Sequence, residues 1–150
     1  MRWRWIEISP TPIPIGLGKI RSGRADETEA HIAEALRLSP RDTLAYAWMG
    51  MAGEAKLQLG SWEQAIAWFR RSIDGNRNFP QMHFELAAAL AQLGRLDEAH
   101  SAVEAGLALN PAFTVSRART LWTAMSDDPT YLAQLEPVFE GLRKAGVPEQ

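Results

Sequence analysis

Few residues in this 150-residue chain have the types and spacing that catalysis requires. The three histidines, His31, His83 and His100, fall on three different predicted helices, so no pair has the i, i+4 spacing of a helical metal site. The chain has no cysteine, which excludes a disulfide, a thiolate metal site and a catalytic thiol. We therefore predict that the protein is not an enzyme and binds no metal and no cofactor.

Two short motifs have ordinary structural explanations. Gly16-Leu17-Gly18-Lys19 is similar to part of a phosphate-binding loop, but it lacks the earlier glycine and has no serine or threonine directly after Lys19. Asp127-Asp128 is a carboxylate pair that is better explained as the cap of a following helix. Neither motif predicts a reaction.

Composition and charge exclude several classes of partner. The net charge is −2, so no strong field for nucleic acid is implied. No apolar run approaches the roughly 20 residues of a membrane span. Arg2-Trp3-Arg4-Trp5 could contact a membrane surface or a nucleic acid, but nothing downstream reinforces it. We predict no nucleic-acid partner, no membrane contact, no signal peptide and a cytoplasmic location.

The clearest pattern is an internal repeat. Gly60-Ser61-Trp62-Glu63-Gln64-Ala65 returns as Gly94-Arg95-Leu96-Asp97-Glu98-Ala99, 34 residues later. A third version, Gly23-Arg24-Ala25-Asp26-Glu27-Thr28, lies 37 residues before the first. A fixed period in the thirties is typical of one helical hairpin repeated along the chain.

Apolar spacing and helix-capping residues place the helices. Gly60 and Gly94 are predicted caps at helix C-termini, Ser61 with Gln64 a capping box, and Asp128 an N-cap. Pro137 predicts a kink or break near Glu136, and residues 146–150 should fray. The predicted helices cover 24–38, 42–59, 61–74, 80–93, 96–109, 113–125 and 129–145.

Residues 1–22 do not fit the repeat. Pro10, Pro12 and Pro14 rule out a helix there, and we expect an irregular apolar arm with a weak strand at 2–8. The arm either docks on this molecule or a neighbour, or is a frayed terminus or remnant of a longer protein. The predicted domains are this arm, 1–22, and a helical repeat domain, 23–146.

The repeats resemble the tetratricopeptide repeat (TPR). Ala65-x3-Phe69 matches the second half of that pattern, and Ala99-x3-Val103 with Pro111 and Thr28-x3-Ile32 with Pro40 are conservative versions. The resemblance covers 23–125 and implies an all-α fold: a right-handed superhelix of helical hairpins (an α-α solenoid), here with a C-terminal capping helix.

The chain departs from the family pattern at its start. The repeat at Gly23 has no recognisable first helix, which leaves one face of helix 24–38 unpaired. The 37-residue spacing implies three extra residues, either in a longer helix from Asp42 or in a longer turn.

The resemblance implies a non-enzymatic scaffold that binds a protein or peptide in its concave groove. Phe84 and Trp122 would be apolar anchors, although the last helix could instead cover Trp122. The family's clamp of Lys, Asn and Arg for a peptide C-terminus is absent. By family register the groove residues are Gly50, Glu54, Gln81, Phe84, Ala88, Gln92, Arg119 and Trp122.

Two further hypotheses concern assembly and origin. Trp3, Trp5 and Trp68 are candidates for self-association, with a homodimer formed through the unpaired first helix; Trp68 could equally pack on Arg71. The segments 36–42 and 126–149 resemble the TPR tails of bacterial adenylate cyclase-like and winged-helix regulatory proteins. That resemblance implies a detached regulatory tail of a signalling enzyme or transcription regulator.

Overall fold

The computed structural model describes Ile20 and residues 23–150, and this part of the chain contains helices and no strand. Except for Ile20, the predicted N-terminal arm lies outside the described residues. The helices are η1 (Ala25–Glu27, a 3-10 helix), α3 (Thr28–Leu38), α4 (Ala45–Gln58), α5 (Trp62–Gly75), α6 (Pro80–Gln92), α7 (Leu96–Leu109), α8 (Val115–Thr123) and α9 (Pro129–Ala145).

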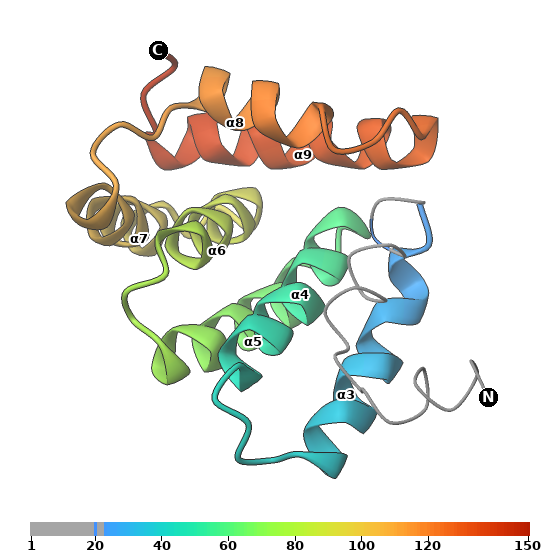
Figure 1. Ribbon diagram of the computed structural model, residues 1–150. Helices are drawn as coiled ribbons and strands as arrows, with labels where there is room; N and C mark the ends of the chain where they lie inside the picture. Colours follow the sequence, from blue (N-terminus) through green and yellow to red (C-terminus); the bar gives the residue numbers. More distant parts are fainter. Residues whose placement is uncertain (1–19, 21–22) are drawn as a thin grey trace.

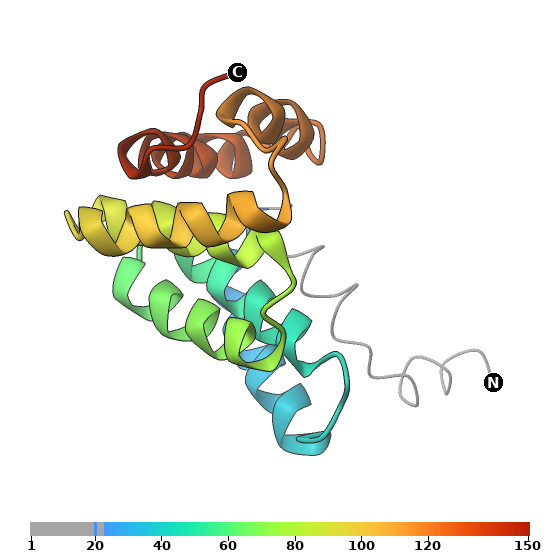
Figure 2. The same cartoon turned by 90° about the vertical axis from the view of Figure 1, so that its left-hand side faces the viewer.

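The helices stack in chain order, which confirms the predicted all-α, TPR-like fold. Figure 2 shows α3 at one end, followed by the α4–α5 hairpin, the α6–α7 hairpin and the α8–α9 pair. Each helix packs on its hairpin partner, and α5 also packs on α6, so the two hairpins share one core. A hairpin buries only one face by itself, and stacking buries the rest.

Glycines end the first helices of both hairpins as predicted. Gly60 and Gly94 have φ of 71° and 75°, a left-handed conformation that glycine adopts without steric cost. Beyond them, the Ser61 N–H donates to the Lys56 carbonyl and the Arg95 N–H to the Leu90 carbonyl, both at 2.9 Å. These bonds satisfy carbonyls that the helix itself leaves unpaired.

The capping box predicted at Ser61 does not form, because the Ser61 side chain makes no capping hydrogen bond. Its backbone (φ −86°, ψ 67°) is set by the turn that closes α4, not by the extended geometry usual at an N-cap. At α9 the predicted cap is confirmed: Asp128 Oδ1 accepts the Tyr131 N–H at 2.9 Å.

The extra residues between the first two repeats lengthen a turn. Helix α4 begins at Ala45 and not at Asp42, and Asp42 Oδ1 accepts the Leu44 N–H at 2.8 Å within that turn. At the other end of the chain, residues 147–149 do not fray. Val147 is buried, and the N–H groups of Val115 and Ser116 donate to the carbonyls of Pro148 and Glu149.

Helix α9 runs unbroken through Pro137, so the predicted break near Glu136 is wrong. A proline inside a helix costs about 3 kcal/mol. Burial of one large apolar side chain contributes about 1.5–3 kcal/mol. The buried face of α9 carries several of them, which outweighs the proline: Leu135, Val138, Phe139 and Leu142.

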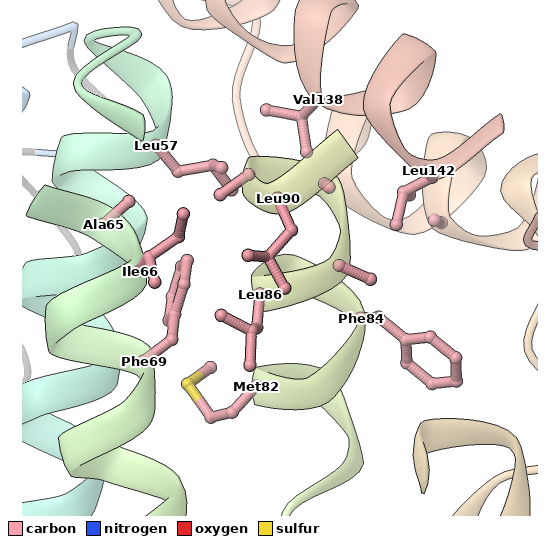
Figure 3. Close-up of a cluster of buried hydrophobic side chains, with 14 of the residues drawn as sticks. Leu57, Ala65, Ile66, Phe69, Met82, Phe84, Leu86, Leu90, Val138 and Leu142 are labelled. Carbon is pink, nitrogen blue, oxygen red and sulfur yellow. The ribbon is translucent and has the colours of Figure 1, made fainter. Parts of the chain in front are cut away.

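Residue volumes at equivalent positions of the two hairpins compensate for each other. A Cβ on Gly53 would lie 2.5 Å from the Phe69 ring, so the ring requires glycine on the facing helix. At the same positions 34 residues later the pair is Ala87 and Val103, a larger residue opposite a smaller one. Figure 3 shows Phe69 pointing toward α6 from α5, where it fills the core between hairpins.

Helix α9 folds back onto α6, which the repeat pattern does not predict. Figure 1 shows α8 and α9 side by side, and α9 packs along α6. The two backbones meet at Gly141 and Ala88, where a Cβ on Gly141 would lie 2.6 Å from the Ala88 carbonyl oxygen. The close approach therefore depends on a residue without a side chain.

We expect Gly141→Ala to destabilise the fold. Alanine favours a helix over glycine by about 1 kcal/mol. Overpacking costs about 1–3 kcal/mol, and here the obstructing atoms are backbone, so the upper part of that range applies. Urea unfolding should show a net loss of about 2 kcal/mol, while Ala133→Ser on the exposed face of α9 changes stability by less than about 0.5 kcal/mol. Equal or greater stability of Gly141→Ala would contradict this packing.

Candidate functional site

Helix α9 occupies much of the surface that the sequence assigns to an open groove. Ala88 lies under Gly141, and Gln92 Nε2 donates to the Pro137 carbonyl. Arg119 is held by Glu136, with Nη1 2.6 Å from Oε1. The prediction that Ala88, Gln92 and Arg119 face a partner is wrong in this structure, because the chain's own last helix covers them.

Phe84 is a core residue and not an exposed anchor. It is 0% exposed, and its ring stacks on Phe113 with centroids 3.7 Å apart. Figure 3 shows it pointing to the side of α6 opposite the Phe69 cluster, where a Cβ on Gly106 would lie 2.8 Å from its ring. Gly50 is also covered, because a Cβ there would lie 2.5 Å from Met82 Sδ.

A cavity of about 280 Å³ remains between α4, α6, α8 and α9. Three of the predicted groove residues line it: Glu54, Gln81 and Trp122. Met125 also lines it and is 44% exposed, which marks where the cavity reaches the surface. Its other apolar lining residues are Ile20, Ala47, Met51, Leu57, Phe79, Met82, Tyr131, Leu135 and Val138.

Trp122 is covered by the last helix, as one of the two sequence-based alternatives proposed. Its ring stacks on Phe139 of α9, with centroids 5.8 Å apart and planes at 18°. Its backbone carbonyl accepts the Tyr131 hydroxyl at 2.9 Å. Trp122 therefore forms a fixed wall of the cavity.

A carboxylate pair lies in the polar part of this cavity. Gln81 Nε2 donates to Glu54 Oε1 at 3.0 Å and to Glu85 Oε1 at 2.6 Å. Glu85 is only 3% exposed, and its Oε2 has no hydrogen-bond partner. Burial is the main cause that raises the pKa of Glu85 well above its usual range, and the neighbouring Glu54 charge raises it further, against the Gln81 hydrogen bond.

Sequence reasoning did not select Glu85 or Gln58 for the site. Glu85 is a single acidic residue inside an otherwise buried apolar stretch of α6, which is the signal that could have identified it. Gln58 lies one turn after Glu54 on α4 and shares its face. The contribution of α9 to the cavity had no local signal.

Trp68 is engaged within the molecule. Its indole Nε1 donates to Glu29 of α3 at 3.1 Å, and the Arg71 guanidinium lies 4.5 Å from its ring centre. The packing on Arg71 agrees with the structural alternative considered for this residue. Trp68 is half-buried and helps to hold α3 against the α4–α5 hairpin.

Two searches of the described residues gave no site. Within residue 20 and residues 23–150, no three His, Asp or Glu side chains cluster so that they could hold a metal ion. No helix in that part of the chain is both long and apolar enough to cross a membrane.

Comparison with known families agrees with the repeat seen in the fold. A family model for the TPR repeat matches residues 53–94, from the middle of α4 to the turn after α6. The chain contains a TPR repeat. No curated protein matches the chain. The resemblance to cyclase-like tails gains no support from these comparisons and stays a prediction.

Solved structures of MamA are similar to this chain. One crystal structure has 17% identity and a TM-score of 0.64, and the match covers 89% of this chain and 78% of MamA. Another, MamA MSR-1 C2, has 18% identity and a TM-score of 0.55, over 87% and 72%. A MamA point mutant has 18% identity and a TM-score of 0.56, over 89% and 75%. At these identities the likeness shows the fold alone.

We expect Glu85→Gln to stabilise the protein at pH 8 and to lose that advantage near pH 4. A carboxyl whose pKa is raised in the folded state is protonated in both states at low pH. As the pH rises, the unfolded chain ionises first, so the stability of the parent falls. Urea unfolding from pH 4 to 8 measures the difference, with Glu104→Gln on the exposed face of α7 as control. Parallel pH profiles for parent and Glu85→Gln would contradict the raised pKa.

Proposed function

We propose that this chain is a non-enzymatic protein-interaction module that binds a polypeptide at the mouth of the cavity between α4, α6, α8 and α9. The observation that carries this proposal is the cavity itself. It lies where the first helices of two successive hairpins face each other, and in a TPR array that side is the binding side.

The composition of the cavity also supports a binding role. Its walls are mainly apolar and aromatic, and its few polar groups converge from α4 and α6. A concave apolar site with a few placed polar groups is typical of ligand recognition. The predicted site thus narrows from the whole groove to Glu54, Gln81 and Trp122, joined by Glu85 and Gln58.

A pair of photocrosslinking variants tests the proposal. A photoreactive residue at Met125, at the mouth, should crosslink a specific polypeptide in extracts of the source cells. The same residue at Leu109, which is 41% exposed on α7 and does not line the cavity, should not. The purified partner should bind the intact chain in isolation. Equal crosslinking at both positions, or no binding by the purified partner, would refute the site.

We also propose that the protein self-associates through the N-terminal edge of the array. Among the described helices α3 packs mainly on α4, and Leu38 at its end is 58% exposed. An apolar side chain beside a helix without a hairpin partner favours a further contact. Trp3 and Trp5 lie outside the described residues and stay candidates for this contact, with Trp68 beside α3.

Sedimentation velocity of the full chain tests self-association. We expect a dimer at tens of micromolar and a shift toward monomer in Leu38→Glu, because a charge at the contact would have to be desolvated. Leu109→Glu, on a different face, should leave the mass unchanged. A monomeric parent at these concentrations would exclude this part of the proposal.

A regulatory tail detached from a signalling enzyme or a transcription regulator remains the alternative, and it rests on the sequence resemblance alone. The cytoplasmic location likewise remains a prediction from the cysteine-free sequence. The division into an arm, 1–22, and a repeat domain, 23–146, is the organisation that we propose for the chain.

A further inference from the structure

The polar groups of the cavity form two facing pairs. Glu54 and Gln58 are four residues apart on α4, and Gln81 and Glu85 are four residues apart on α6. Residues at this spacing lie on the same face of a helix. The Gln81 amide joins the two carboxylates and spends both of its Nε2 hydrogens on them.

The cavity is left with unpaired acceptors. Glu85 Oε2 and Gln58 Oε1 are buried and have no hydrogen-bond partner. Among the described residues that line the cavity, none is a lysine or an arginine. A buried acceptor without a partner costs about 1–3 kcal/mol, and more when it carries charge. The chemistry of the cavity therefore calls for an occupant that donates several hydrogen bonds and carries positive charge.

The size and walls of the cavity restrict that occupant further. About 280 Å³ lies just below the range of roughly 300–1,000 Å³ typical of small-molecule and cofactor sites. The walls beside the carboxylates are apolar, including Met51, Leu57 and Leu135. Lysine and arginine combine a flexible apolar stem with a cationic head that donates three and five hydrogens respectively.

We propose that the cavity receives one basic side chain, from a lysine or arginine of the partner polypeptide, with its cationic head between Glu54 and Glu85. The stem lies along the apolar wall, and the head donates to Glu85 Oε2 and Gln58 Oε1. This inference rests on the proposed function, because it specifies which polypeptide segment the module selects.

Single amino-acid derivatives test the chemistry of the cavity in the intact chain. The probes are N-acetyl-lysine-N′-methylamide, its arginine counterpart, and the norleucine counterpart, which keeps the stem and lacks the charge. Binding is followed by the NMR signals of the Met51 and Met82 methyl groups, which line the cavity. We expect at least one basic probe to bind at least tenfold more tightly than the norleucine probe.

Matched charge variants give the control. Glu54→Gln with Glu85→Gln should bring the basic-to-norleucine ratio close to one. Glu63→Gln with Glu104→Gln removes the same charge from exposed positions and should leave it unchanged. If the double variant in the cavity does not fold, Glu85→Gln alone, which is isosteric, should still lower the ratio. A norleucine probe that binds equally well, or a ratio that survives Glu85→Gln, overturns the inference.

A double-mutant cycle separates this inference from the proposed function. In the partner crosslinked at Met125, each lysine and arginine of the crosslinked segment is replaced by norleucine or glutamine. One replacement should weaken binding at least tenfold in the parent and have no effect in Glu54→Gln with Glu85→Gln. Partner binding that ignores both changes retains the proposed function and overturns the basic side chain. Binding of n-butylammonium with no polypeptide partner overturns both and indicates a free-amine site.

Discussion

The structure depends on the close contact between the backbones of α6 and α9. Because Gly141 has no side chain, α9 can approach the Ala88 carbonyl and lie in the concave side of the array. This contact buries α6 on every side: α5 and α7 cover two of its faces, α9 covers a third, and α4 contacts its edge. A helix surrounded in this way has little use for polar residues, and α6 is mostly alanine, leucine and other apolar side chains.

The same contact turns an open groove into a small cavity. Where α9 meets α6 directly, at Ala88 and Gln92, no space is left for a partner. Toward the ends of α4 and α6, the side chains of Trp122, Tyr131 and Leu135 bridge the gap without filling it. The fold therefore keeps the side of the molecule that TPR proteins use for binding, but restricts access to the neighbourhood of Met125.

Glu85 is the residue at which the energetics of folding and of binding conflict. A carboxyl that is 3% exposed, beside a second carboxylate and with one oxygen unpaired, destabilises the fold at neutral pH. Natural sequences break local rules of this kind mainly at functional sites. A cationic group from a partner would satisfy the carboxyl, so the defect in the isolated chain and the recognition chemistry have the same origin.

The sequence by itself determined the helices, their order and the pairing into hairpins. These features depend on local signals: the left-handed glycines Gly60 and Gly94, the Asp128 cap, and apolar spacing that repeats every 34 residues. Only the tertiary structure decided which faces stay open. Phe84 and Trp122 have the composition of anchors, but Phe113 and Phe139 cover them, and those partners come from distant parts of the chain. The path of α9 depends on one Gly–Ala contact between helices whose spacing in sequence carries no signal, and such contacts are fixed by packing in three dimensions.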